Sequence, residues 1–101
     1  MTRLITQTER DIAMNIEYLV CQDLGTTRQA INSARRDHMS TRSRFAVWYV
    51  LRERYSFSYE LIGQLYGKHH TTVIKGIAKA MEDGYVQNLG ITLGKRKRTV
   101  S

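Results

Sequence analysis

The chain contains no proline, and its seven glycines are confined to a few places. Proline breaks a helix because it lacks the backbone N–H and clashes with the preceding turn, whereas glycine commonly ends one. Helices in this sequence can therefore run without interruption between glycine stops. We predict an all-α fold, a compact bundle of about five helices.

The first two helices are predicted from capping boxes, in which a Thr side chain and a Glu or Gln three positions later bond each other's backbone N–H groups. Thr6 has such a partner, and the helix that it opens ends before Gly25. Thr26 has one too, and opens a shorter helix that continues to about Ala34. The apolar face of the first helix comprises Ile12, Ile16, Leu19 and Val20.

The most apolar stretch, FAVWYVL, lies in a helix that we predict from Arg42 to about Arg54. Its hydrophobic residues lie all round the helical projection instead of along one stripe. A helix of this kind is buried on several sides, so we place it in the centre of the bundle.

The next two helices are short and separated by a turn that contains Gly67. Ser58 is suited to cap the first of them, and Thr71 or His70 the second, which continues to Gly84. Gly63 is small enough to let the two helices approach closely. The spacing predicts a helix-turn-helix at about 58–83. An ordinary αα-hairpin fits the same geometry and stays open at this point.

A chain of 101 residues, 42% of them hydrophobic, can build one compact core. We predict a helical domain over residues 1–84 and a basic C-terminal tail or short hairpin over residues 85–101, which includes the run KRKR. Sixteen Lys and Arg against nine Asp and Glu give a formal charge of +7. An excess of this size in so short a chain favours polyanionic partners.

Cys21 is the only cysteine, which excludes an intrachain disulfide and favours a small core residue in a reducing compartment. No stretch approaches the ~18 consecutive apolar residues of a membrane span. We therefore expect a cytoplasmic, nucleoid-associated protein with no membrane partner.

The stretch YGKHHTTVIKG, residues 66–76, contains residue types that three kinds of site use. A phosphate loop is excluded because the glycine spacing is one residue short and His69 stands where Ser or Thr would hold magnesium. A zinc site is disfavoured because His69 and His70 would point about 100° apart on a helix, with no nearby cysteine or carboxylate. No nucleophile motif or carboxylate cluster is present either. We predict no catalytic residue, no metal, no nucleotide and no other cofactor.

The third kind of site is a helix tip that reads DNA. A helix N-terminus in the major groove directs its free N–H groups to phosphate and its short side chains to base edges. Imidazole can donate to guanine, and a threonine hydroxyl can bond either base while its methyl packs on thymine. His69, His70, Thr71 and Thr72 suit this task, and Lys68 beside them suits a phosphate.

At these residues the sequence resembles the C-terminal DNA-binding domain of the bacterial replication initiator DnaA. That family's signature runs Ser-Leu-Pro-Glu-Ile-Gly, then an aromatic residue and Gly, then Arg-Asp-His-Thr-Thr-Val. The likeness extends more loosely upstream, through the segment LGTTRQAINSARRDHMSTRSRFAVWYVLRE. The matching positions are Ser58, Ile62, Gly63, Tyr66, Gly67, His70, Thr71, Thr72 and Val73.

The resemblance implies roles for the matching residues. The tip of the last helix, at His70, Thr71 and Thr72, would face bases in the major groove together with His69, and Arg36 would reach the adjacent minor groove. The predicted phosphate contacts are Arg44, Arg52, Ser58, Tyr59, Lys68 and Lys75.

Two departures from the family pattern bear on function. His69 replaces the family's aspartate, so an acceptor for cytosine gives way to a ring that can donate. Glu60 replaces the family's proline. We also expect no ATP-driven initiation, because the 101 residues leave no room for a nucleotide-binding module.

We therefore predict a sequence-preferring, double-stranded DNA-binding protein that is not an enzyme. It would regulate transcription or replication by occupying initiator-type sites, as a standalone domain encoded by a phage or mobile element, with a homodimer as one possible state. The alternative is an interaction protein that uses the initiator-like domain to bind a host replication or transcription protein.

Overall fold

The computed structural model describes residues 4–32, 37–84 and 86. Its described part contains five helices and no strand, which confirms the all-α prediction. The helices are α1 (Gln7–Leu24), α2 (Arg28–Ile31), α3 (His38–Tyr55), α4 (Tyr59–Tyr66) and α5 (His70–Asp83).

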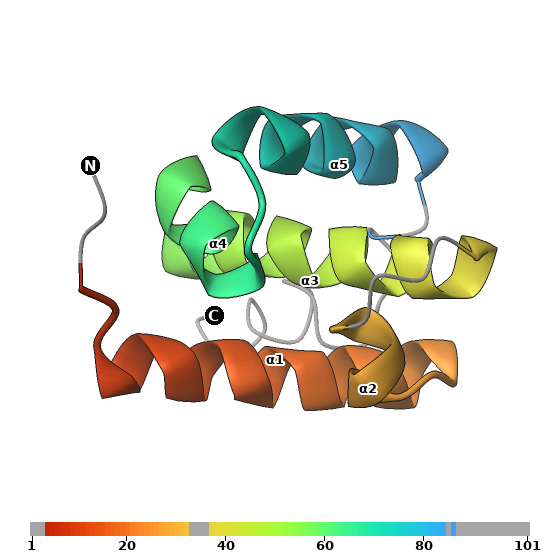
Figure 1. Cartoon of the computed structure of the whole chain (residues 1–101). Coiled ribbons are helices and arrows are strands. Elements are labelled where there is room, and N and C mark those ends of the chain that lie inside the picture. The colour runs from red at the N-terminus through yellow and green to blue at the C-terminus, as the bar shows by residue number, and fades with distance from the viewer. Residues whose placement is uncertain (1–3, 33–36, 85, 87–101) are drawn as a thin grey trace, which may run out of the picture.

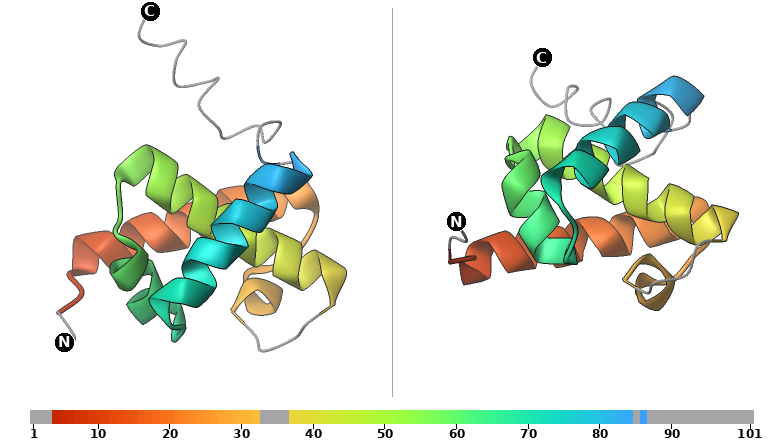
Figure 2. Two further views of the ribbon diagram at one scale, coloured as in Figure 1. Left: turned by 90° about the horizontal axis from the view of Figure 1, so that it is seen from above. Right: turned by 45° about the horizontal axis from the view of Figure 1, so that its top comes forward.

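Helix α3 lies between α1 and α5, with α1 below it and α5 above it in the view of Figure 1. Helix α5 crosses α3 obliquely, as the view from above in Figure 2 shows. The short α2 packs beside α1 and α3, and α4 packs beside α5 at one end of α3. The start of α5 therefore lies beside α4, and the rest of α5 extends along α3 away from it.

The centre of the core is on α3, as the sequence predicts. Ala46, Val47 and Trp48 are consecutive and therefore point to different sides of the helix, about 100° apart, yet all three lie buried at no more than 1% exposure. They do so because α3 packs against α1 on one side and α5 on the other. The other buried apolar residues of α3 are Val50 and Leu51.

A glycine allows the close crossing of α3 and α5. A Cβ added to Gly76 would lie 2.7 Å from the ring of Phe45 and 2.8 Å from that of Trp48. Both distances are too short for ordinary contact, so only glycine fits at this crossing without movement of the aromatic rings.

Several helix ends lie where the sequence places them. Thr6 forms a complete capping box with Glu9, and Ser58 accepts a hydrogen bond from the Leu61 N–H at 3.0 Å. Gly25, Gly67 and Gly84 end their helices with φ of 70°, 67° and 77°. This left-handed conformation favours glycine and explains why the stops fall at these residues.

The predicted ends of α2 were wrong. Thr27 caps this helix, with its hydroxyl accepting from the Ala30 N–H at 3.1 Å. Thr26 instead donates its N–H to the Cys21 carbonyl at 3.2 Å and so lies just after the C-cap of α1. Helix α2 then ends at Ile31 and not at about Ala34.

The predicted starts of α3 and α5 were also wrong. Helix α3 begins at His38, because the Asp37 carboxylate caps it by accepting from the Ser40 N–H at 3.1 Å. The first turn of α3 is polar, and the apolar pattern begins only after it. The pattern therefore placed the start of the helix at Arg42, which is too late. Helix α5 is capped by His69, and not by His70 or Thr71.

Val86 is fully buried, so the packed core reaches past Gly84. Residues 87–101, predicted to form a basic tail or short hairpin, lie outside the described residues. Among the helices that the structure does describe, none combines the length and apolar character needed to cross a bilayer.

Candidate nucleic-acid interface

The turn between α4 and α5 is fixed by backbone contacts. The Lys68 N–H donates to the Gly63 carbonyl at 2.8 Å, across the C-terminal end of α4. A Cβ on Gly63 would lie only 2.4 Å from the Lys68 carbonyl oxygen. Glycine at this position therefore lets the turn fold back onto α4 and sets the angle at which α5 leaves it.

The tip of α5 presents polar side chains. His69, Thr71 and Thr72 are exposed and His70 is half-buried, whereas Val73 in the same turn is fully buried. The buried side of α5 continues through Gly76, Ile77 and Ala80, which pack into the core. The helix is therefore anchored by one face, and the predicted base-reading residues lie on the exposed part of its first turn.

The cap at His69 gives this tip a defined geometry. Its ring nitrogen Nδ1 accepts from the Thr71 N–H at 3.2 Å and lies 2.9 Å from the Thr71 hydroxyl. The ring also packs against that of His70, with centroids 4.3 Å apart. Contacts with two neighbours therefore fix the orientation of the His69 side chain.

Three of the predicted phosphate contacts come together where α4 begins. The Arg52 guanidinium lies 4.3 Å from the centroid of the Tyr59 ring and donates from Nη1 to the Phe57 carbonyl at 3.1 Å. Ser58 lies between these residues in sequence and is exposed. This cluster, Arg52 with Ser58 and Tyr59, holds the Arg52 guanidinium near the start of α4. Lys68 and Lys75 are both exposed, in the turn and on α5.

Arg44 is placed differently from the other predicted phosphate contacts. Its side chain is buried, and Nε donates to the Ile31 carbonyl at 3.0 Å, which joins α3 to the end of α2. Burial lowers the pKa of this guanidinium, and the nearby Asp37 partly opposes that effect. The position favours a structural role for Arg44. Arg36, the predicted minor-groove contact, lies outside the described residues.

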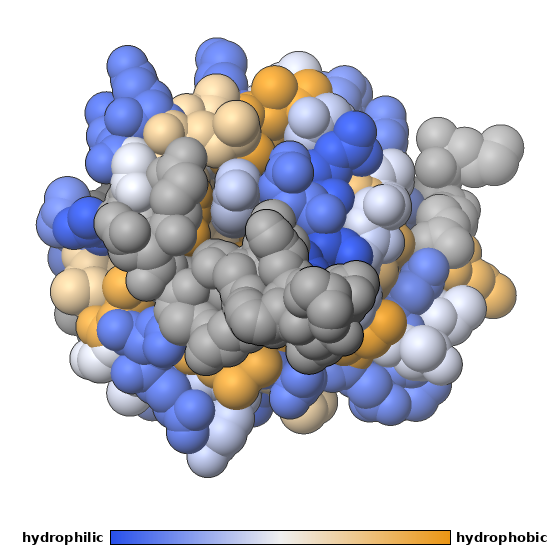
Figure 3. Space-filling view, turned by 180° about the vertical axis from the view of Figure 1, so that it is seen from behind, coloured by the Kyte–Doolittle hydropathy of each residue, from blue (hydrophilic) through white to orange (hydrophobic). Residues whose placement is uncertain are grey.

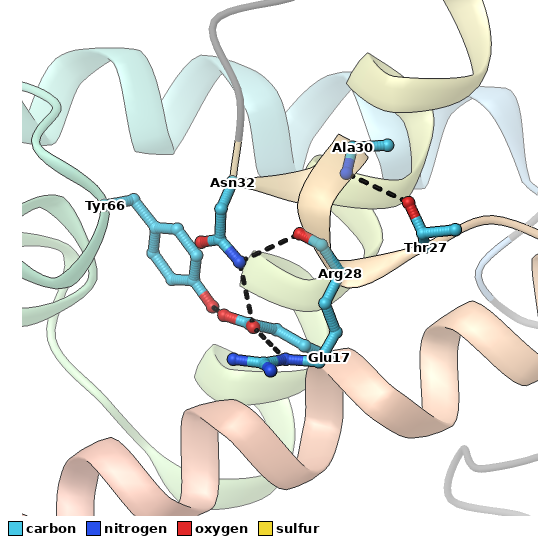
Figure 4. A network of polar contacts seen from close by, with 6 residues as sticks. All are labelled: Glu17, Thr27, Arg28, Ala30, Asn32 and Tyr66. Carbon is cyan, nitrogen blue, oxygen red and sulfur yellow. Dashed lines mark hydrogen bonds and ion pairs between the residues drawn. The ribbon is translucent and has the colours of Figure 1, made fainter.

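A buried polar network surrounds Glu17 (Figure 4), and it was not predicted from the sequence. Glu17 is 4% exposed, and its Oε1 accepts from Arg28 Nε at 3.0 Å and from Asn32 Nδ2 at 3.1 Å. Its Oε2 accepts from the Tyr66 hydroxyl. The carboxylate thus ties α1 to α2 and to the last residue of α4.

Tyr66 carries this network to the helix-turn-helix. Its ring lies 6.1 Å from that of Trp48, and its hydroxyl reaches Glu17. Burial raises the pKa of Tyr66, and the charge of Glu17 and the hydrogen bond to it raise it further. Because Gly67 follows at once, the start of the turn is held in place from both α1 and α3.

One signal for Glu17 was present in the sequence. The buried face of α1 comprises Ala13, Ile16 and Val20, and Glu17 occupies the same face at helical spacing. A carboxylate on an apolar stripe needs donors from elsewhere in the fold, because burying an unpaired charge is costly. The sequence does not show which donors they are.

Comparison with known proteins adds to this geometry. The family model described as the bacterial DnaA protein helix-turn-helix matches residues 10–80, which is more than half of the chain. No curated protein and no solved structure gives a significant match. The matched region contains α2, α3, α4, the turn and most of α5, including the whole exposed tip. The chain belongs to the bacterial DnaA helix-turn-helix family, whose domains bind DNA.

Proposed function

We propose that the protein binds double-stranded DNA with sequence preference and regulates transcription or replication by occupying initiator-type sites. In this proposal the first turn of α5 enters the major groove. His69, His70, Thr71 and Thr72 then face base edges, as the N-terminal residues of a recognition helix do.

One observation carries the proposal: the polar tip of α5 is exposed, while the turn before it is held rigidly. The bond from Lys68 to Gly63 fixes the turn, and the bond from Tyr66 to Glu17 fixes the end of α4. A site that reads bases needs side chains held in place before binding, because ordering them on binding weakens affinity.

The phosphate contacts in this proposal fall into two groups. Lys68 and Lys75 lie on the turn and on α5, and the cluster of Arg52, Ser58 and Tyr59 lies where α4 begins. Phosphate contacts fix the register of the protein on the duplex without reading its sequence. Each one also releases counterions, so affinity should fall steeply with salt.

The experiment begins with selection of bound duplexes from a random pool, which yields the preferred site and shows whether half-sites are single or paired. Titrations of that site and of a scrambled duplex then follow at two salt concentrations. Thr72→Ala should cost about 1 to 3 kcal/mol on the preferred site and much less on the scrambled one.

Arg52→Ala should weaken binding to both duplexes about equally and reduce the slope of log affinity against log salt by about 0.9. Arg10→Ala is the matched control, because Arg10 is exposed on α1 and its loss changes the net charge equally. The proposal fails if Thr72→Ala leaves the site preference intact, or if Arg10→Ala and Arg52→Ala weaken binding to the same extent.

A second candidate function is binding of a host replication or transcription protein. The observation that favours it lies on α1, where Met14 is 46% and Tyr18 56% exposed beside a hollow of about 480 Å³. On the face opposite to that of Figure 1, the visible surface interleaves hydrophobic with hydrophilic residues (Figure 3). Absence of duplex binding at low salt would favour this candidate, whereas steep salt dependence would favour DNA.

A further inference from the structure

The cap of α5 determines which nitrogen of His69 carries a proton. Nδ1 lies 3.2 Å from the backbone nitrogen of Thr71, in the direction of its N–H. A backbone N–H can only donate, so Nδ1 must accept and carries no proton. The neutral ring is then protonated on Nε2.

The same contact settles the role of the Thr71 hydroxyl. Its Oγ1 lies 2.9 Å from the same Nδ1. Because Nδ1 has no hydrogen to give, any hydrogen bond in this pair is donated by the hydroxyl, and it shares the single Nδ1 lone pair with the Thr71 N–H. Toward a ligand, the His69 ring therefore keeps only a donor, the N–H of Nε2.

The donor on Nε2 is held in a fixed direction. Among the residues that the structure describes, only Thr71 hydrogen-bonds the His69 ring. The His70 ring packs against it at a centroid distance of 4.3 Å and a tilt of 31°. His69 is exposed, and Nε2 is the ring nitrogen farther from the capped backbone. The tip of α5 thus offers a fixed N–H donor at its outermost residue.

We propose that His69 is a specificity-determining residue whose Nε2–H selects guanine at one base pair of the site. Guanine offers two adjacent acceptors, O6 and N7, in the major groove, whereas adenine places a donor beside its N7 and thymine a methyl group beside its O4. A carboxylate at this cap would accept only, and so would select the amino group of cytosine. The inference rests on the proposed function, because it requires the α5 tip to lie in the major groove.

The first test needs no DNA. Nitrogen-15 NMR of the histidine rings, at a pH where they are neutral, distinguishes a protonated from an unprotonated ring nitrogen. The inference predicts that His69 is protonated on Nε2 and bare on Nδ1. A His69 ring protonated on Nδ1 would overturn it, whatever the protein binds. His38, on another helix, provides an internal reference signal.

The second test compares base preference among variants of one residue. His69→Asp keeps a strong N-cap and replaces the hydrogen-bond donor with an acceptor. His69→Asn also keeps the cap, and its amide offers both a donor and an acceptor. Selection from a random pool should show one position where the wild type prefers guanine and His69→Asp prefers cytosine, each by roughly tenfold. His69→Asn should show a weaker preference at that position, and the other positions should stay unchanged. Circular dichroism of each variant verifies that α5 is intact.

The outcomes separate this inference from the function on which it rests. An unchanged base preference in His69→Asp overturns the role of His69 and leaves DNA binding by the α5 tip in place. A wild-type chain that selects no duplex overturns both. A change of preference at many positions would also contradict the inference, because it would mean that the variant alters the docking of the whole helix.

Discussion

Replacing Gly63 with alanine tests how strongly DNA reading depends on the turn between α4 and α5. The added Cβ would lie 2.4 Å from the Lys68 carbonyl oxygen. That oxygen would have to move by about 1 Å to reach ordinary contact. The movement would strain or break the 2.8 Å bond from the Lys68 N–H to the Gly63 carbonyl.

The magnitude follows from two opposing effects. Overpacking of this kind typically costs about 1 to 3 kcal/mol. Alanine is a better helix former than glycine, which offsets about 1 kcal/mol. We expect Gly63→Ala to lower the free energy of unfolding by up to about 2 kcal/mol. Urea denaturation followed by circular dichroism measures this difference.

The effect on DNA binding should exceed the effect on stability. A shifted Lys68 displaces His69 and the first turn of α5, so the base contacts would be misaligned even in the folded protein. Gly25→Ala is the control, because Gly25 ends a helix, with φ of 70°, and its added Cβ would have no atom within 4 Å. This variant should lose about 1 to 2 kcal/mol through left-handed strain alone, at the far end of α1.

Duplex titration at a temperature where both variants are folded should therefore show normal affinity for Gly25→Ala and reduced affinity for Gly63→Ala. Equal affinity of the two variants would refute the link between the turn and the reading tip. A Gly63→Ala variant that is more stable than the wild type would refute the packing argument itself.

Three further predictions concern the buried polar groups. Tyr66→Phe should lower the free energy of unfolding by about 1.5 to 3 kcal/mol in urea denaturation, because the buried Glu17 carboxylate loses a donor. Because burial and Glu17 raise the pKa of Tyr66, an unfolded tyrosine loses its proton above about pH 10 while the folded one keeps it. The free energy of unfolding should therefore decrease as the pH rises through this range, and it should decrease less in Tyr66→Phe. Urea titrations across the range measure it, and the same decrease in both proteins would contradict the prediction. Arg44→Met should lower the free energy of unfolding by about 1 to 3 kcal/mol, because the Ile31 carbonyl loses its buried donor. Duplex binding by Arg44→Met should depend on salt as it does in the wild type. A smaller slope of log affinity against log salt would instead show that Arg44 contacts a phosphate.

The sequence predicted the features that depend on neighbouring residues. Thr6 and Ser58 cap their helices, and Gly67 and Gly84 end theirs, because capping and left-handed φ act within a few residues. The central position of α3 followed from apolar residues all round it. The exposed tip of α5 followed from the spacing of its polar residues before a buried valine.

The sequence did not predict the features that depend on distant packing. Glu17 and Tyr66 bond across 49 residues, and no local pattern pairs them. Arg44 carries a charge that suits phosphate, yet its position against α2 buries it. His69 was not expected as the cap because Thr71 and His70, the two candidates, lie within two residues of it, and local sequence does not fix a helix boundary that closely.

The most direct test of DNA reading by the α5 tip is to map the interface on the protein itself. Backbone amide signals are recorded by NMR during titration with the selected duplex. The account predicts the largest shifts at residues 68–72, at Lys75 and where α4 begins, with little change at Met14 and Tyr18 on α1. Shifts centred on α1, with the tip of α5 unaffected, would contradict it.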